Sequence, residues 1–152
     1  MDEMSTAIKD FSIKRVSKNK KLLLMGMACM NFCATTCFSL LAPFFPGEAS
    51  FKGVSQTVTG LIFGIFEITI FASAPVYGKY VSRIGAKFMF ISGAMVCGGC
   101  AILFGVLNKG PDGTIFIVMC FLCRTLEGLG CSAYVTAMFA IIAYEFPANV
   151  AT

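Results

Sequence analysis

Three ionisable residues stand inside long apolar stretches of this sequence, and they are the residues best suited to carry chemistry. Glu67 lies near the middle of one stretch, while Arg124 and Glu127 lie together in another. An ionised side chain at the centre of a membrane-spanning helix costs about 2.5–3.5 kcal/mol on insertion scales, so its presence requires a partner or a wet cavity. We therefore take these three as candidates for binding a solute or a coupling proton, together with the polar Asn31 of the first apolar stretch.

The two acids differ in how their charge can be compensated. A spacing of three residues puts Arg124 and Glu127 on one helical face, where they can pair and cancel part of their desolvation. Two interpretations stay open for them: a structural ion pair, or a pair that also lines or gates a transport path. Glu67 has no basic residue in its own stretch, and an unpaired acid in hydrocarbon favours its neutral form unless it borrows Arg124. We expect Glu67 and Glu127 to attract a cationic or amine substrate in alternation with a proton.

The eight cysteines raise the question of a metal or redox site. Cys97 with Cys100, and Cys120 with Cys123, form two CxxC pairs that would suggest zinc in a soluble protein. Each pair lies in an apolar run of spanning length, where free cysteine behaves as a small hydrophobe. With no histidine in the chain, the sequence favours neither a metal nor a cofactor, and it argues against an enzyme. Small residues at helical spacing are interpreted as packing faces: Cys29, Cys33 and Cys37, Gly60 and Gly64, and Gly128 and Ser132.

The composition shows what must position these residues. Of 152 residues, 57% are hydrophobic and 13% charged, with a mean hydropathy of +0.82, against about 25% charged residues in soluble domains. A chain of this length has too little interior to bury so much apolar surface. Four runs are long enough to cross a bilayer as helices, approximately 22–45, 58–77, 88–107 and 114–144. The predicted fold class is all-α, a polytopic membrane protein whose bundle occupies residues 22–152.

Basic residues gather on one side of the predicted spans. Nine Lys and Arg lie before the first span or between the second and third, and two lie in the other connections. The positive-inside rule then predicts cytoplasmic termini, with residues 1–21 as a polar, irregular leader. The connections are predicted at about 46–57, 78–87 and 108–113, with Pro43, Pro46 and Pro75 at span ends. The basic flank can attract membrane lipid, and no nucleic-acid binding is expected because topology already accounts for these charges.

The connection after the second span contains a motif. Its sequence, Gly78-Lys79-Tyr80-Val81-Ser82-Arg83-Ile84-Gly85-Ala86-Lys87, resembles the signature that major facilitator superfamily transporters place between their second and third helices. Gly78, Arg83, Gly85 and Lys87 fall in register, and the resemblance implies that they form a conformational gate. Two positions depart from the pattern, since Ser82 stands where an Asp is usual and Ala86 where a basic residue is common. Both bear on the charge contacts that help to lock the inward-closed state.

The fourth span carries a second resemblance. Its segment Arg124-Thr125-Leu126-Glu127-Gly128-Leu129-Gly130 resembles the superfamily signature of an Arg followed by two glycines, here Gly128 and Gly130, which implies a role in proton coupling. With the segments 43–49 and 147–152, the chain after residue 21 resembles the polyamine-transporting branch of the vesicular amine transporter group. This resemblance implies a twelve-helix fold in two halves and proton-driven antiport of polyamines or related organic cations into vesicles. The first span has no acidic residue, whereas monoamine members carry an Asp there, which argues against monoamine chemistry.

Four spans are only the first part of that twelve-helix fold. We therefore expect the chain to be a fragment of a longer secondary active transporter and not to transport by itself. The expected partners are a small cationic solute and protons in the longer parent, membrane lipid, and the remaining transporter half. The alternative is a non-transporting four-span protein that associates with full-length copies and regulates them. The expected location is a secretory or synaptic-type vesicle membrane, with the plasma membrane as the alternative.

Overall fold

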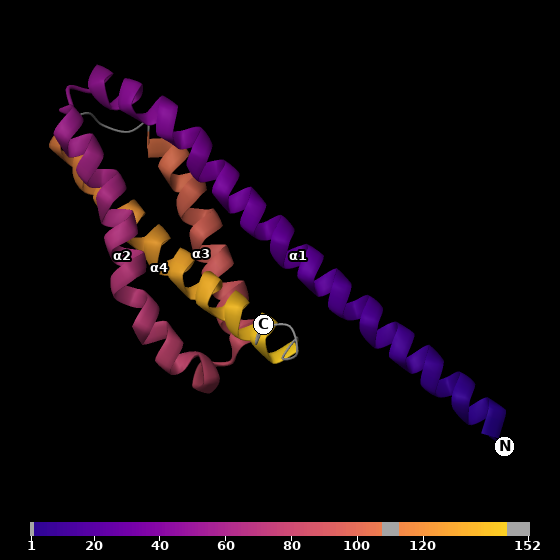
Figure 1. Ribbon diagram of the computed structural model, residues 1–152. Coiled ribbons are helices and arrows are strands. Elements are labelled where there is room, and N and C mark those ends of the chain that lie inside the picture. The colour runs from indigo at the N-terminus through magenta and orange to yellow at the C-terminus, as the bar shows by residue number, and fades with distance from the viewer. Residues whose placement is uncertain (1, 108–112, 146–152) are drawn as a thin grey trace. The chain divides into compact units, whose positions relative to one another are not determined.

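Four long helices make up the computed structural model, which describes the backbone of residues 2–107 and 113–145 and the side chains of residues 20–107 and 113–145. In these ranges the helices are α1 (Asp2–Phe51), α2 (Gln56–Ile84), α3 (Ala86–Val106) and α4 (Thr114–Glu145), as Figure 1 shows. Each is long and apolar enough to cross a membrane, the first from Lys20 onward. The predicted all-α class with four spans is confirmed.

The chain divides into two units, residues 1–35 and residues 36–152, and each is described by itself. The first unit is the N-terminal part of α1. The sequence predicted an irregular leader, but the structure is helical from Asp2 onward. Residues 2–25 contain no Pro or Gly that would interrupt a helix. Farther along, Leu22 and Met25 are exposed at 70% and 69%. A helix with such an apolar surface suits lipid rather than water.

The turn between α1 and α2 lies later than the prolines suggested. α1 continues through Pro43 and Pro46 to Phe51, so the loop predicted at 46–57 is corrected to a short turn that ends before Gln56. The helix stops where Gly53 adopts φ +74°, and the amides of Gly53 and Val54 donate to the carbonyls of Ser50 and Ala49 at 3.1 and 2.9 Å. This is a Schellman motif, in which a glycine after the helix end satisfies its last carbonyl groups.

The connection predicted at 78–87 is almost entirely helical. α2 continues past Pro75 to Ile84 and α3 begins at Ala86, so Gly85 alone separates them. Gly85 has φ +95° and ψ 119°, a conformation that a side chain disfavours, and its amide donates to the carbonyl of Val81 at 3.1 Å. The predicted loop is therefore corrected to a one-residue turn. The connection predicted at 108–113 lies outside the described residues except for Gly113.

In the second unit, α4 is the element against which both α2 and α3 pack, while α2 and α3 contact each other little. The end of α1 closes one end of this arrangement with Phe45, whose ring lies 4.9 Å from that of Phe104 and 5.6 Å from that of Phe63. The apolar core around Phe45 draws on all four helices and consists of Ala49, Val54, Ile62, Cys100, Phe104, Phe116, Cys120 and Cys123.

Glycines let α4 approach its neighbours at backbone distance. A Cβ added to Gly93 of α3 would lie 2.7 Å from both the Gly130 carbonyl oxygen and the Tyr134 amide nitrogen, and one added to Gly128 would lie 3.0 Å from the Phe66 carbonyl oxygen. Gly93 was not among the packing residues predicted from the sequence. The packing face predicted at Gly60 and Gly64 is not used among the described residues, since an added Cβ at either meets nothing within 4 Å.

We predict that Gly93→Ala destabilises the bundle, because the new methyl group must push two backbones apart. Overpacking of this kind costs about 1–3 kcal/mol. The matched control is Gly98→Ala on the same helix, where an added Cβ meets nothing within 4 Å and helix propensity improves. Unfolding of the purified chain in mixed detergent micelles, followed by circular dichroism, measures both. Equal midpoints for the two variants would contradict the close crossing.

Candidate functional site

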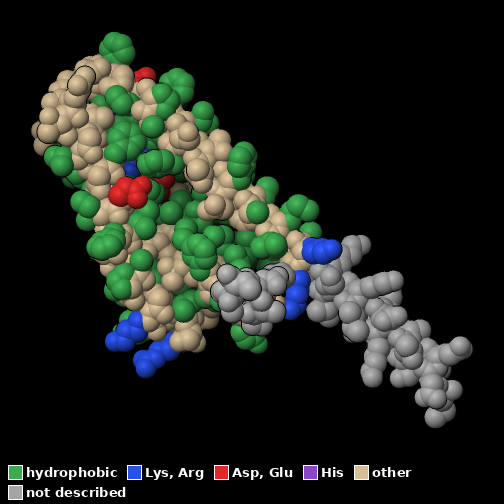
Figure 2. Space-filling view, viewed as in Figure 1, with side chains coloured by type: hydrophobic (Ala, Val, Ile, Leu, Met, Phe, Trp, Pro, Cys, Tyr) green, Lys and Arg blue, Asp and Glu red, His purple; other side chains and the backbone are tan. Residues whose placement is uncertain are grey.

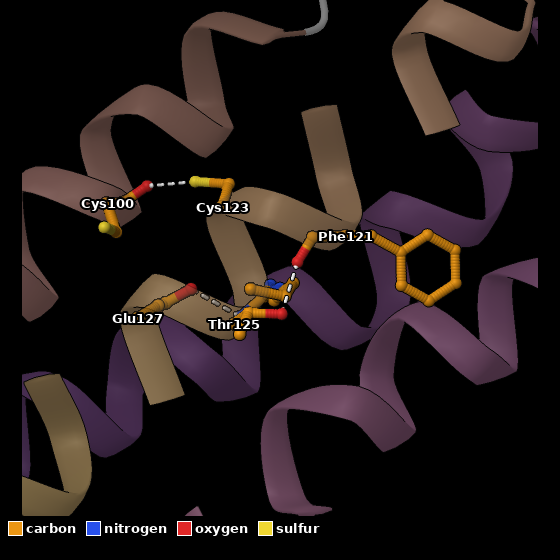
Figure 3. Close-up of polar contacts among 6 residues, drawn as sticks. Cys100, Phe121, Cys123, Thr125 and Glu127 are labelled. Atoms are coloured by element: carbon orange, nitrogen blue, oxygen red, sulfur yellow. Dashed lines mark hydrogen bonds and ion pairs between the residues drawn. The ribbon is translucent and has the colours of Figure 1, made fainter. Parts of the chain in front are cut away.

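The centre of the site is an ion pair on α4. The Nη1 group of Arg124 donates to Oε2 of Glu127 at 2.9 Å, and the two side chains are only 1% and 11% exposed. Figure 3 shows the Glu127 carboxylate at one end of the dashed line that marks this contact. The spacing of three residues thus produces the pair that the sequence predicted, since such residues lie on one helical face.

Four phenyl rings surround the Arg124 guanidinium. Its central carbon lies 4.2 Å from the centroid of the Phe104 ring, and 5.5, 5.7 and 5.9 Å from those of Phe63, Phe66 and Phe38. The faces of aromatic rings are electronegative and attract cations, more strongly where water is excluded. These rings come from α1, α2 and α3, so we call them the phenylalanine box. No local sequence signal marks them, because the box forms only when the four helices pack.

The ion pair with Glu127 and the phenylalanine box leave some hydrogen-bond donors of Arg124 without a partner in the described part of the chain. Its Nε and Nη2 groups are buried and have no hydrogen-bond partner among the described residues. A buried donor left unpaired costs about 1–3 kcal/mol, and more when it is charged. Such donors therefore favour the entry of water or of a group that accepts hydrogen bonds.

A cavity of about 500 Å³ lies beside the ion pair, and both Arg124 and Glu127 line it. Its other walls are apolar and come from the second half of α1, from α3 and from the box itself: Phe38, Leu41, Phe44, Ala101, Ile102 and Phe104. Figure 2 shows acidic and basic atoms together in a hollow of a face that is otherwise mostly hydrophobic. An apolar cavity with a few convergent polar groups is the usual form of a small-molecule site.

Two of the predicted site residues lie elsewhere. Glu67 is exposed on α2 and is not the acid that pairs with Arg124. The reason is geometric, because successive helical side chains point about 100° apart and Phe66 is the one that faces Arg124. Asn31 is exposed in the first unit, where its carbonyl oxygen accepts a hydrogen bond from the Thr35 hydroxyl at 2.9 Å. As part of the first unit, it is described by itself, and its role in binding stays a prediction.

The two predicted signatures take up separate places. Gly78, Arg83, Gly85 and Lys87 are exposed at the junction of α2 and α3, and Arg83 lies in the last turn of α2, where a cation interacts favourably with the helix dipole. Gly128 and Gly130 are buried on α4 next to the ion pair, where they allow the close helix contacts described above.

We predict that Glu127→Leu destabilises the bundle strongly, while Glu67→Leu changes its stability little. Removing one partner of a buried ion pair leaves an uncompensated charge and costs about 3–5 kcal/mol, whereas Glu67 is exposed. Unfolding of both variants in mixed micelles gives the comparison. If Glu67→Leu were the more damaging of the two, Glu67 would be the true partner of Arg124.

Comparison with known proteins places the chain in a family. Residues 27–151 match the model of the Major Facilitator Superfamily. The chain is 48% identical over 139 residues to the MFS-type transporter SLC18B1 of Rattus norvegicus. The aligned region covers 91% of this chain and 30% of that protein. It is 46% identical over 137 residues to the protein of that name from Homo sapiens, and the aligned region covers 90% of this chain and 30% of that protein.

A more distant relative is the multidrug resistance protein 1 of Bacillus subtilis (strain 168), 25% identical over 126 residues, with 83% of this chain and 31% of that protein covered. No solved structure matches the chain. The chain spans about 30% of the length of the curated relatives it matches. With its four apolar helices and a family match over most of its length, this multi-pass membrane protein belongs to the major facilitator superfamily.

Proposed function

We propose that this chain is the N-terminal four-helix part of a secondary active transporter that exchanges protons for polyamines or related organic cations across a vesicle membrane. Family membership and the relatives named as transporters support the transport class. The observation that carries the proposal is the buried pair of Arg124 and Glu127 at the edge of a cavity of about 500 Å³.

The pair suits coupling because one carboxylate cannot serve two cations at once. Glu127 is held by Arg124 through one hydrogen bond at 2.9 Å and also lines the cavity. A proton or an ammonium group that reaches this carboxylate displaces the other, and Arg124 holds the empty carboxylate through its hydrogen bond in the interval. A buried pair is a weak device for stability alone, so its position beside a cavity favours a role in exchange.

The surroundings suit an organic cation with a flexible aliphatic chain. The cavity walls are apolar apart from the ion pair, and aromatic rings such as Phe38 and Phe104 can take an ammonium group on their faces. A polyamine carries several ammonium groups separated by methylene segments, so it is best matched by more than one acid. Glu67 is exposed on α2 and does not line this cavity, so it serves as a separate second acid in this proposal, and a substrate with one amine would not require it.

The orientation follows from the charge distribution. Lys79, Arg83 and Lys87 are exposed at the junction of α2 and α3, and the basic residues in the first part of α1, at 9–21, lie on the same side of the membrane when all four helices cross it. The positive-inside rule places that side in the cytoplasm. The cavity is then loaded from the cytoplasm, and protons leaving an acidic vesicle drive the exchange.

A second function is supported by the apolar surface of the second unit. Large side chains such as Met95 and Ile102 are exposed at 74% and 72%, and such a surface also suits a four-span protein that associates with a complete transporter. Co-expression with the complete rat relative, followed by native electrophoresis, tests this alternative. Migration of the two proteins as one complex supports it, and separate migration removes it.

We predict that a chimera transports. In this chimera, residues of this chain replace the matched 139 residues of the rat relative. Proteoliposomes with an acidic interior should take up labelled spermidine, and an ionophore that collapses the pH gradient should abolish the uptake. The unmodified relative is the control for assembly. Transport by that control with none by an equally folded chimera would contradict the proposal.

We predict further that Glu127→Gln in this chimera abolishes exchange, because the amide binds neither a proton nor an ammonium group by charge. Glu67→Gln should weaken spermidine uptake more than the uptake of a monovalent amine, since it removes only the second acid. Initial uptake rates at several external pH values measure both variants. Full retention of transport and of its pH dependence in Glu67→Gln would remove Glu67 from the mechanism.

A further inference from the structure

Two pairs of cysteines face each other across the contact between α3 and α4. The Cys123 thiol donates to the carbonyl oxygen of Cys100 at 3.2 Å. One to two turns farther along the interface, the side chains of Cys97 and Cys131 lie close enough to interact with each other. Cys97 and Cys100 belong to the CxxC pair of the sequence analysis, whereas Cys131 carries no motif.

The helix backbones touch at the level of the second pair. A Cβ added to Gly130, the neighbour of Cys131, would lie 2.9 Å from the backbone nitrogen of Cys97. The Cα atoms of Gly130 and Cys131 are about 3.8 Å apart, as in any trans peptide. A disulfide spans Cα atoms about 4.4–6.8 Å apart, so two thiols in contact beside such a close approach lie within its reach.

A metal is a poorer occupant than a disulfide. Among the described residues no group of three or more metal-binding side chains comes together, and structural zinc takes four ligands. The two thiols therefore form a two-sulfur site, whose characteristic chemistry is oxidation to a disulfide.

We propose that Cys97 and Cys131 are a redox modification site that links α3 to α4 on exposure to a peroxide. Hydrogen peroxide oxidises one thiol to a sulfenic acid and is itself reduced to water. The other thiol then attacks that sulfur, the sulfur–sulfur bond forms, and the sulfenic oxygen leaves as a second water with the remaining proton. Two thiols and one peroxide thus give one disulfide and two waters, and a dithiol reductant reverses the link.

The site differs from the neighbouring pair at Cys100 and Cys123 in how its thiols are placed. Cys100 and Cys123 are buried at 6% and 7% exposure, and Figure 3 shows the Cys123 sulfur directed at the Cys100 carbonyl oxygen rather than at its sulfur. Cys97 and Cys131 are only partly buried, and the Tyr134 side chain also interacts with Cys131. Peroxide therefore reaches this pair more easily than the pair at Cys100.

The link would act on the ion pair. Cys131 lies one helical turn beyond Glu127 on the same face of α4, because residues four apart are neighbours on a helix. A disulfide to Cys97 holds this turn of α4 against α3. Oxidation therefore fixes the helix that carries Arg124 and Glu127 at the place where it crosses its neighbour.

The test uses the purified 152-residue chain in lipid nanodiscs with one chain per disc, treated with hydrogen peroxide. Remaining thiols are alkylated, and the chain is digested and analysed by mass spectrometry without reduction. We expect a linked peptide of Cys97 and Cys131 and the loss of two hydrogen atoms in mass, reversed by dithiothreitol. Cys97→Ala and Cys131→Ala should each abolish the link, while the matched controls Cys100→Ala and Cys123→Ala should retain it.

The wild-type measurement decides the question even if a variant fails to fold. Recovery of both Cys97 and Cys131 as alkylated thiols from peroxide-treated, natively helical chain would overturn the proposal, and so would a dominant link between Cys100 and Cys123. As a second readout, the thermal midpoint of the oxidised wild type should rise above that of the reduced form, with no such rise in Cys97→Ala. Neither readout involves transport, so this inference can fail while the proposed function stands.

Discussion

The arrangement depends on one constraint, that a guanidinium must be kept inside an apolar bundle. Arg124 is 1% exposed, and the chain meets its charge with one carboxylate and four aromatic faces. The carboxylate comes from the same helix and the rings come from three others. Because the rings belong to α1, α2 and α3, solvation of this one side chain ties the position of every helix in the second unit to α4.

Glycines on α4 allow the other helices to come close enough to surround Arg124. A ring can reach the guanidinium only if its helix comes close to α4, and Gly128 and Gly130 remove the side chains that would hold α2 and α3 away. Between lipid-exposed helices the hydrophobic effect offers little driving force, so close packing and polar contacts must hold them together. The Ser132 hydroxyl, which donates to the Ile70 carbonyl oxygen at 3.3 Å, is one such contact between α4 and α2.

Features that depend on neighbouring residues could be predicted from the sequence, whereas contacts between helices could not. Helix number, approximate spans and the pairing of Arg124 with Glu127 follow from hydropathy and from helical spacing, which are properties of neighbouring residues. The turns at Gly53 and Gly85 lie within the connections predicted at 46–57 and 78–87, but both connections are shorter than predicted because the helices continue to these glycines with positive φ. The phenylalanine box, Gly93 and the contact of Cys97 with Cys131 depend on how helices cross, and no pattern along one helix encodes that.

The central place of α4 has a consequence for biogenesis. α2 and α3 touch each other little and rely on α4 for their packing, so when they leave the ribosome first they have almost nothing to hold them together in the bilayer. α4 arrives last of the four with two charges whose separate insertion would cost about 2.5–3.5 kcal/mol each. Its entry is then coupled to the gathering of the earlier helices around it, so that translation of a single segment brings about both the integration and the packing of these four helices.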